Sequence, residues 1–515
     1  MDETTCDLLV VGGGLTGLIA GLRCADKHSV TVLEGRDRLG GRTETRTETG
    51  ANGDTWFDFG AHFIGKDRPQ ENIWKLVTEE LGLDVFEQYE GPKNAHPPPS
   101  WAGQAANLVA IAKGSDLTVE PYVGQIYPSH LGADVVMAEL EALLTAAEWI
   151  DLERLPPGLD ADMTVDAWAR DHFVSRAATD EVVQLLDMLC RVGLSAPSTE
   201  VSLVFFLFYI ASSGGLDRFS NVRYPDQGAQ GYRLRRGTMS ISDKLGDRLR
   251  EAGGDIRLGH KVVAMDFTGE TGVATCENGA RVRFRTALVA MAPPLANRIE
   301  MTPPLPQERT KAASLMKMGQ TVLACVHLTE PFWRTDTTRY RTGHVGLWKT
   351  DDISRYGLSG AALIAGDGPV VWTMDNVSDE GDAAMFAFIV GRDAEIWHTL
   401  PPAKREALVL QRIGELFGAD RLRETFVRYE EKDWTTDPFS AGCPACHFGA
   451  HDFVPSVPWI MTGHMPEFQN GRLFFASTES AKVSNGYMSG AIWSGEETAK
   501  MITARLWSGR APAAN

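Results

Sequence analysis

The sequence contains no run of lysine or arginine long enough to neutralise a phosphate backbone, and its charge is predominantly negative. Fifty basic residues face 68 acidic ones, which gives a formal net charge of −18. A protein that binds nucleic acid needs clustered cations to neutralise the phosphate backbone. The composition therefore predicts no nucleic-acid partner.

Long hydrophobic runs are also absent. The longest apolar stretch is VSLVFFLFYIA at residues 201–211, which is shorter than the roughly 20 residues of a membrane-spanning helix. We expect it to form a buried helix. The first residues are acidic and lead directly into a strand pattern, and the last six residues (RAPAAN) match no lipidation or peroxisomal signal. These features predict a soluble, cytoplasmic protein with no membrane partner.

Cysteine does not form a paired framework. The seven cysteines are scattered, and only Cys443 and Cys446 lie close together in sequence. An odd count in a large chain indicates a reducing compartment rather than a disulfide scaffold. With 43% hydrophobic and 23% charged residues and no internal repeat, the chain is typical of a globular enzyme of several domains.

The clearest local pattern is at the N-terminus. Residues 7–11 form a short apolar run, glycines follow at 12–14, residues 15–26 have helical spacing, and residues 29–33 form a second apolar run. This order predicts a βαβ unit with parallel strands and a right-handed crossover.

The rest of the chain alternates between helical and strand patterns. A proline-rich loop at 96–99 precedes amphipathic segments at 135–150, 165–173, 180–192 and 200–211. Strand patterns return at 256–258, 262–267, 273–276 and 287–291, and another strand series begins at 321–328. The sequence therefore predicts an α/β unit interrupted by a helical insertion.

The glycine motif GGGLTG at residues 12–17 follows the first strand and opens the helix. Its spacing permits a tight turn and close approach of the backbone to a pyrophosphate, next to the positive end of the helix dipole. Glu34, after the second strand, is placed to accept hydrogen bonds from a ribose diol. The alternative is a glycine-rich turn without a ligand. The residues predicted to hold the dinucleotide are Gly12, Gly14, Leu15, Thr16, Gly17 and Glu34.

A second glycine-containing segment, EGRDRLGGRT at 34–43, favours FAD over NAD. Gly41 lets this loop approach the pyrophosphate, and Arg36 and Arg42 can offset its charge. With this segment the sequence resembles the flavin-containing amine oxidase family, which includes monoamine oxidase, polyamine oxidase and L-amino-acid oxidase. The resemblance continues at 58–65 (DFGAHFIG), 228–230 (GAQ), 330–333 (EPFW), 475–480 (FASTES) and 486–491 (GYMSGA).

The resemblance implies a fold of class α/β plus α+β. An FAD-binding Rossmann-like domain of the GR2 type, at 1–83, 235–300 and 437–505, is interleaved with a mixed sheet and helical substrate-binding domain at 84–234 and 301–436. Residues 506–515 form a C-terminal tail. By the same resemblance, the flavin is bordered by Gly60, Ala61, His62 and Phe63, the adenine side by Val262, and the ribityl chain and ring by Ser477, Glu479 and Met488.

The segment around Cys443 resembles the monoamine oxidase stretch in which a tryptophan lies by the flavin and a cysteine is linked to it. Trp434 and Cys443 keep the nine-residue spacing. Because a thiolate is a strong nucleophile, we predict an 8α-S-cysteinyl link between Cys443 and FAD. The alternatives are a redox pair with Cys446, half of a zinc site, or a plain buried thiol. No second Cys-x-x-Cys exists, and the sequence predicts no metal.

Tyr487 falls where the family places one wall of an aromatic cage in front of the flavin. The position of the opposite wall is occupied by Pro444, and the position of the family lysine is occupied by Leu323. Lys317 lies six residues upstream of Leu323, and nothing in the sequence indicates that it replaces the family lysine. The cage is therefore expected to be incomplete.

Three further polar residues are candidates for the cavity. Gln230 is expected to face substrate, as the family glutamine does. Arg236, at a position where the family has glycine, holds an anionic or enolate group of the substrate or is an ordinary surface arginine. His62 and His447 act as bases or ligands, or are merely hydrogen-bonded.

The function implied by the resemblance is that of an FAD-dependent oxidase. It removes a hydride equivalent from a carbon next to nitrogen to flavin N5, and O2 reoxidises the flavin to give hydrogen peroxide. The substrate is predicted to be bulky and aromatic. Alternatives are an oxidocyclase that closes a ring on an indole alkaloid, a simple monoamine, polyamine or L-amino-acid oxidase, a non-catalytic flavoprotein, and an NAD(P)-dependent dehydrogenase.

Overall fold

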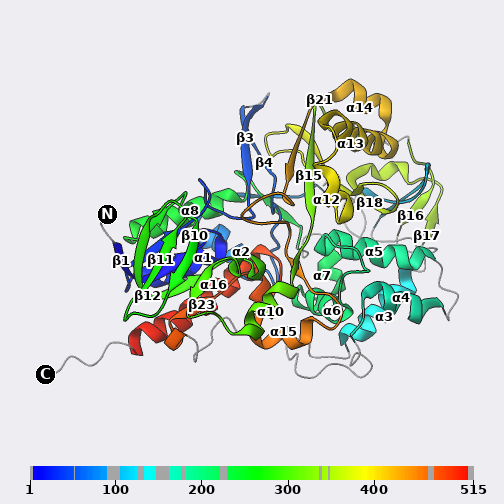
Figure 1. Cartoon of the computed structure of the whole chain (residues 1–515). Coiled ribbons are helices and arrows are strands. Elements are labelled where there is room, and N and C mark those ends of the chain that lie inside the picture. The colour runs from blue at the N-terminus through cyan, green and yellow to red at the C-terminus, as the bar shows by residue number, and fades with distance from the viewer. Residues whose placement is uncertain are drawn as a thin grey trace.

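The architecture comes from a computed structural model of the chain (Figure 1). It describes residues 4–50, 53–89, 105–123, 133–145, 162–174, 180–220, 229–335, 339–345, 348–461 and 469–508. The proline-rich loop at 96–99, residue 228 of the GAQ motif and residues 509–515 of the predicted tail lie outside the described residues. In Figure 1 a sheet containing β1, β11 and β12 occupies one side of the molecule, and a second sheet with its helices occupies the other.

The first sheet has eight strands drawn from three distant parts of the chain. Its order is β13-β10-β11-β12-β1-β2-β9, with β23 also paired to β12. The strands are β1 (Thr4–Val11), β2 (Val30–Leu33), β9 (Asp255–Arg257), β10 (Val262–Asp266), β11 (Gly272–Cys276), β12 (Arg281–Val289), β13 (Glu300–Thr302) and β23 (Leu473–Phe475). β1 is parallel to both β2 and β12, so the predicted βαβ unit is confirmed. The domain boundaries themselves stay a prediction.

Two helices pack against the crossover helix of this unit. Helix α1 (Leu15–Ala25) follows β1 and packs against α8 (Met239–Glu251) and α16 (Met488–Ser508). A Cβ atom on Gly17 would lie 2.1 Å from the carbonyl oxygen of Gly12. The helix can therefore approach the end of β1 this closely only because residue 17 has no side chain.

The second sheet has nine strands in the order β17-β16-β7-β6-β18-β19-β20-β15-β21. Its centre is apolar, because all eight residues of β15 (Thr321–Leu328) are buried. Its other strands are β6 (Ala106–Lys113), β7 (Asp116–Val123), β16 (Gly343–Val345), β17 (Trp348–Thr350), β18 (Leu358–Gly366), β19 (Val370–Asp375), β20 (Ala383–Val390) and β21 (Phe426–Asp433). Helices α12 (Arg392–Trp397) and α13 (Pro402–Phe417) pack on it.

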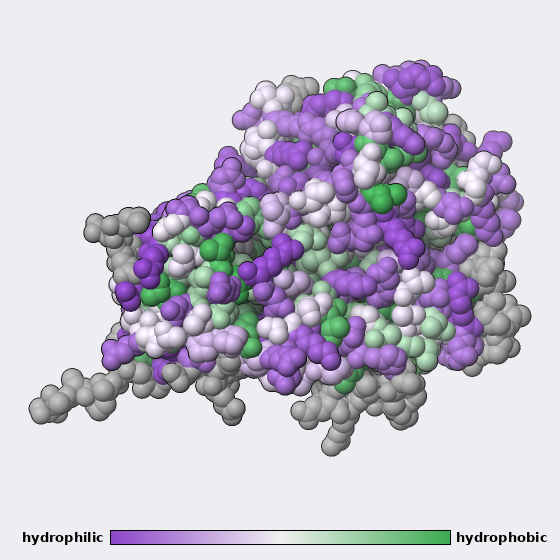
Figure 2. Space-filling view, viewed as in Figure 1, coloured by the Kyte–Doolittle hydropathy of each residue, from purple (hydrophilic) through white to green (hydrophobic). Residues whose placement is uncertain are grey.

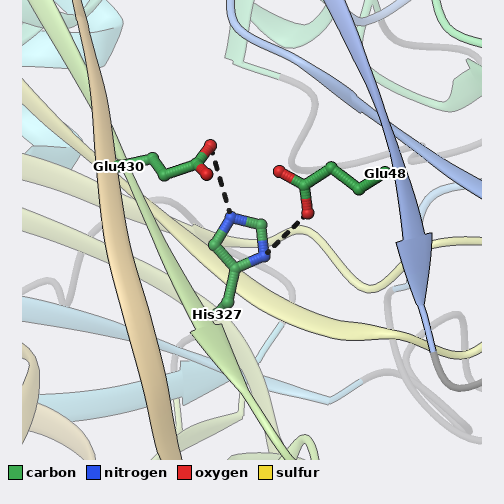
Figure 3. Close-up of side chains that lie close together, drawn as sticks. All are labelled: Glu48, His327 and Glu430. Atoms are coloured by element: carbon green, nitrogen blue, oxygen red, sulfur yellow. Dashed lines mark ion pairs between the residues drawn. The ribbon is translucent and has the colours of Figure 1, made fainter.

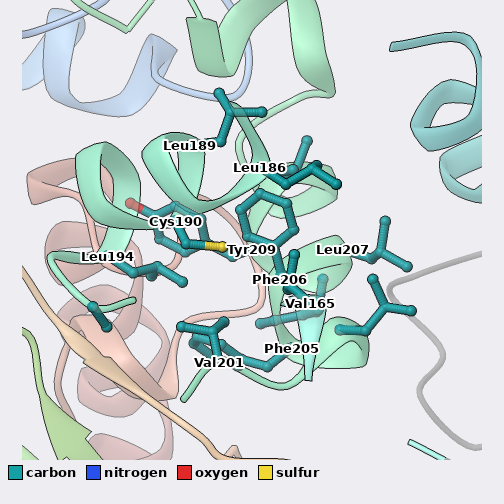
Figure 4. Close-up of a cluster of buried hydrophobic side chains, with 14 of the residues drawn as sticks. Val165, Leu186, Leu189, Cys190, Leu194, Val201, Phe205, Phe206, Leu207 and Tyr209 are labelled. Carbon is teal, nitrogen blue, oxygen red and sulfur yellow. The ribbon is translucent and has the colours of Figure 1, made fainter. Parts of the chain in front are cut away.

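The helical insertion contains α3 (Ala133–Thr145), α4 (Val165–Val174), α5 (Asp180–Leu194) and α6 (Leu203–Ser212). Nine of the ten residues of α6 are buried, so the prediction of a buried helix for the longest apolar run is confirmed. Ser202 caps α6 by accepting a hydrogen bond from the Phe205 N–H. In Figure 4, side chains of α5 and α6 point toward one another, among them Leu186, Cys190, Leu194, Phe205 and Phe206.

The sequence patterns predicted no element between the proline-rich loop and residue 135, where the structure has a hairpin. Residues 106–123 form the β6–β7 hairpin, whose strands join the second sheet through β18 and β16. The turn at Gly114, which has a φ of +60°, and the short apolar runs around it are typical of a hairpin. The substrate-side sheet therefore begins before the helices rather than after them.

No helix in the described part of the chain combines the length and the apolar character that crossing a membrane requires. On the face shown in Figure 2, hydrophobic residues are scattered among hydrophilic ones. Large exposed apolar side chains such as Trp348, Ile396 and Val427 lie on different elements, as is normal for a globular surface.

The contact between α1 and β1 generates a prediction. We expect Gly17→Ala to lower the free energy of unfolding by about 1–3 kcal/mol, because the new Cβ overlaps the Gly12 carbonyl. Gly14→Ala is the control, since nothing lies within 4 Å of a Cβ there and φ is −79°. Urea unfolding followed by circular dichroism measures both. Equal midpoints for the two variants would contradict the close approach.

Candidate active site

A single cavity of about 440 Å³ runs from the first sheet to the second. It begins at the carboxyl ends of β1 and β2, where Val11 and Leu33 line it, and it reaches Trp372 of β19 and Phe388 of β20. The crevice outside the carboxyl ends of parallel strands is where doubly wound sheets bind ligands. Most of the predicted site residues meet here: Gly12, Gly14, Leu15, Thr16, Glu34, Arg36, Gly41, Arg42, Gly60, Ala61, His62, Phe63, Gln230, Val262, Cys443, Ser477, Tyr487 and Met488.

The N-terminus of α1 opens into this cavity. Its first N–H groups are not capped by a side chain, because the N-cap residue is Gly14. A Cβ on Gly14 would meet nothing within 4 Å, so open space lies in front of the helix. Uncapped N–H groups and the positive dipole end suit a pyrophosphate. Gly17 does not line the cavity and serves only the packing of α1.

Glu34 occupies the end of β2. Its side chain is almost fully buried, and its two oxygens accept hydrogen bonds from the backbone N–H groups of Gly13 (2.7 Å) and Arg36 (2.8 Å). These bonds fix the carboxylate beside the cavity, where each oxygen keeps a second lone pair for a ribose hydroxyl. His260, Lys261 and Val262 line the same end.

The two arginines predicted to offset the pyrophosphate charge are both paired within the protein. Arg36 donates to Asp437 at 2.6 Å, and Arg42 donates to Glu479 at 2.5 Å. Burial acts to raise the pKa of Glu479, but Arg42 outweighs it and holds that pKa below its usual range. Glu479 does not line the cavity and acts through Arg42.

His62 lines the cavity but is held as a neutral group. Burial lowers its pKa to about 3, against the opposing effect of the hydrogen bond between Nδ1 and the Gly60 carbonyl. Its Nε2 is 3.3 Å from the sulfur of Met374. The ring is therefore neutral at neutral pH, with its Nδ1–H donating to the Gly60 carbonyl, and it contributes shape and hydrogen bonding.

Cys443 lines the cavity on a loop fixed from several sides. Its N–H donates to the Gly319 carbonyl (2.8 Å), and its carbonyl accepts from the Thr321 hydroxyl (2.7 Å). Arg42 donates to the next carbonyl, that of Pro444, at 2.8 Å. Burial raises the pKa of the thiol to about 12, although the positive charge of Arg42 acts to lower it. The thiol is thus protonated at neutral pH.

The surroundings of Trp434 and Cys446 bear on the alternatives to a flavin link at Cys443, which are a redox pair, half of a zinc site or a plain buried thiol. Trp434 is buried, donates from Nε1 to the Phe59 carbonyl (2.7 Å) and lies outside the cavity lining. The sulfur of Cys446 is 3.0 Å from that of Met318. Among the described residues, neither cysteine belongs to a group of three potential metal ligands.

Tyr487 has an aromatic neighbour that sequence reasoning missed. The ring of Tyr209 on α6 stacks on Tyr487 with 5.7 Å between centroids and 19° between planes, and both residues line the cavity. A Cβ on Gly486 would lie 2.8 Å from the Tyr209 ring, so the glycine makes room for it. The partner ring comes from the helical insertion, and it contacts Tyr487 directly instead of facing it across a gap.

Gln230 and Arg236 are separated by the fold. Gln230 lines the cavity, whereas Arg236 is exposed and lies over the Trp56 ring at 5.6 Å.

Leu323 is buried in the core beside Phe386, and Lys317 is paired with Glu200 at 3.1 Å. Among the described residues that line the cavity, the only lysine is Lys261, at the end that Glu34 occupies.

His447 is also outside the cavity lining. Its side chain is almost fully buried on β22 (Cys446–His447), where burial lowers its pKa to about 4. It pairs in register with Lys317 of β14 (Lys317–Met318). This histidine is placed for packing, and nothing in the described lining brings it to a substrate.

The far end of the cavity is apolar and aromatic. Trp372 and Phe388 stack with 4.6 Å between centroids. Sequence reasoning missed this end because its residues come from strands and helices with no motif of their own. It includes Tyr122, Leu189, Val192, Phe219, Leu363, Val371, Trp372, Phe388 and Val390.

A second polar cluster lies away from the cavity. In Figure 3 the imidazole of His327 lies between the carboxylates of Glu48 and Glu430, each at 3.9 Å. These three have the spacing of metal ligands, but the guanidinium of Arg428 pairs with both glutamates. Arg46 also pairs with Glu430 at 3.7 Å, so two arginines compensate the two carboxylates, and the cluster joins β3 (Thr45–Gly50) to β15 and β21 as an ion-pair network.

The cavity fits FAD on the observations above. The uncapped helix end and the open space at Gly14 suit the pyrophosphate, the fixed carboxylate of Glu34 suits a ribose, and the aromatic end remains for a flavin and a small organic molecule.

Comparison with known proteins agrees with this geometry. Residues 15–503 match the family model described as flavin containing amine oxidoreductase. Amine oxidase [flavin-containing] B of Canis lupus familiaris is 27% identical over 96% of this chain and 86% of its own length. Probable flavin-containing monoamine oxidase A of Dictyostelium discoideum is 28% identical over 98% of this chain and 99% of its own.

Solved structures share the fold. Putrescine oxidase bound to putrescine has a TM-score of 0.77 at 23% identity and covers 98% of this chain and 100% of its own. Cyclohexylamine oxidase from Brevibacterium oxydans IH-35A has a TM-score of 0.78 at 22% identity, with 98% and 99% covered. The predicted fold class and the predicted family are confirmed. Because the family model spans nearly the whole chain, the protein belongs to the flavin-containing amine oxidoreductases.

Proposed function

We propose that this oxidoreductase is an FAD-dependent oxidase of a C–N bond, with O2 as the final electron acceptor and hydrogen peroxide as product. We further propose that FAD is attached through its 8α carbon to Cys443 and that the substrate is a bulky aromatic amine. The observation that carries the proposal is the continuous cavity, which joins a dinucleotide end at α1 to an aromatic end at Trp372 and Phe388.

The protein side chains supply orientation rather than acid–base chemistry. Bound FAD would accept the electrons of the C–H bond next to nitrogen. His62 is neutral, and no lysine of the described lining lies at the aromatic end. Tyr487, backed by Tyr209, offers a rigid ring against which a neutral amine can be held.

The distribution of charge in the lining favours an apolar substrate. Among the described residues that line the cavity, Glu34 is the only one with a carboxylate, and it lies at the nucleotide end. A diamine such as putrescine would leave its second ammonium group unpaired at the aromatic end. An aromatic or cyclic monoamine would instead pack on the Trp372–Phe388 pair.

The function is tested by measuring hydrogen peroxide release with purified protein and a panel of amines. We expect aromatic and cyclic amines to exceed putrescine in kcat/KM by at least about tenfold, because an unpaired buried charge is costly. An indole alkaloid and L-amino acids belong in the same panel. Bleaching of the flavin absorbance under nitrogen by the same amines is the control for direct reduction. Putrescine as the best substrate would contradict the proposed substrate class.

The covalent link is tested by Cys443→Ser. We expect the wild-type flavin to stay with acid-precipitated protein, and the flavin of the variant to be released into the supernatant, because a serine hydroxyl is a far weaker nucleophile than a thiol. Cys446→Ser is the matched control, since its sulfur contacts Met318 away from the cavity lining. Release of flavin from the wild-type protein would exclude the link.

The different positions of Gln230 and Arg236 give a paired prediction. We expect Gln230→Ala to lower kcat/KM by about tenfold or more, because a polar group in the cavity lining is lost. Arg236→Ala should change it by less than about twofold, because the side chain is exposed on Trp56. Steady-state kinetics with the best amine measure both. The reverse order would show that Arg236 reaches the substrate.

A further inference from the structure

The loop that carries Cys443 is built around the side chain of Asp437. One carboxylate oxygen, Oδ1, accepts hydrogen bonds from the N–H groups of Phe439 (3.0 Å) and Ser440 (2.9 Å). The Asp437 carbonyl accepts from the N–H of Ala441 at 2.7 Å. The carboxylate thus holds the first half of the loop in one conformation.

Two cations from other elements bind the same carboxylate. Arg36, after β2, donates to Oδ1 at 2.6 Å, and Lys432 of β21 donates to Oδ2 at 3.1 Å. Arg36 also donates to the Ser440 hydroxyl at 2.7 Å. Burial acts to raise the pKa of Asp437, but Arg36 and Lys432 outweigh it and keep that pKa below its usual range. Asp437 is therefore ionised at neutral pH.

The second half of the loop is constrained by its backbone. Ala441 has a φ of +54°, which is unfavourable for a residue with a side chain, and Gly442 has a φ of +140°. A Cβ on Gly442 would lie 2.3 Å from the Gly319 carbonyl. Such a conformation persists only where its surroundings hold it. The place of Cys443 in the cavity therefore depends on the anchors at either end of the loop.

These contacts connect the nucleotide end of the cavity to the reactive thiol. Arg36 lines the cavity near Glu34, and its guanidinium reaches across to the loop that ends at Cys443. The Arg36–Asp437 ion pair therefore has two effects: it positions Arg36 at the cavity end near Glu34, and it fixes the loop that carries Cys443.

We propose that Asp437 is a positioning residue for covalent attachment of FAD: through Arg36 and the loop amides it sets the Cys443 thiol for thioether formation. This inference rests on the proposed link at Cys443. In the net reaction the S–H bond of Cys443 and one C–H bond of the 8α methyl group break, and an S–C bond forms. The two hydrogens with their two electrons pass to O2, which becomes hydrogen peroxide.

The test compares Asp437→Asn with Asp433→Asn in purified holoenzymes. Asp433 lies four residues before Asp437 at the end of β21. Its carboxylate accepts hydrogen bonds from the N–H groups of Thr435 and Thr436 rather than from an arginine. Total flavin per chain, flavin released by acid precipitation and intact protein mass are measured for each. Asp437→Asn should bind FAD as the wild type does but release at least about ten times more of it, because a small displacement of reacting groups slows a reaction strongly.

The controls separate positioning from general stability. Asp433→Asn should retain its flavin covalently, and Asp437→Glu should recover part of the attachment because it keeps a carboxylate for Arg36. An Asp437→Asn protein with wild-type covalent flavin, or one that loses total flavin and thermal stability together, would overturn the positioning role. Complete release from the wild type would overturn the attachment itself, and the positioning role with it.

Discussion

Two partly buried arginine–carboxylate pairs connect the end of the cavity at α1 to the segments that complete its other walls. Arg36 pairs with Asp437 on the cysteine loop, and Arg42 pairs with Glu479 ahead of the segment that carries Tyr487. Removing one partner of such a pair is destabilising, because the remaining charge is left uncompensated in partly buried surroundings. Segments about 400 residues apart in sequence are held together in this way.

The cavity walls carry few groups that change protonation near neutral pH. Burial lowers the pKa of His62 and raises that of Cys443, so both are uncharged in the folded protein. Most of the other side chains at the aromatic end are rings and aliphatic groups, although the lining also includes the polar side chains of Asn107, Arg191 and Gln230. This distribution is appropriate for a site in which a cofactor performs the redox step and the protein determines which C–H bond is presented to it.

Motifs with a local physical cause were predictable from sequence. The βαβ unit, the glycine turn and Glu34 follow from strand and helix periodicity and from the backbone freedom of glycine. The buried helix at 203–212 follows from its continuous apolar run. The β6–β7 hairpin was missed although a turn at Gly114 signalled it, because the neighbouring helical patterns dominated the interpretation. Arg236 was a candidate by its position in a motif, yet the backbone directs it to solvent over Trp56.

The sequence by itself determined the glycine turn, the N-terminus of α1 and Glu34 at one end of the cavity, because these belong to one βαβ unit whose geometry is set by nearest neighbours. Only the tertiary structure decided the other half. Tyr209 meets Tyr487, Trp372 meets Phe388 and Arg36 meets Asp437 because separate segments pack around a common core. Contacts between residues far apart in sequence leave no periodic pattern in the chain. Each partner fits the pattern of its own helix, strand or loop, and only the folded structure shows that the two residues touch.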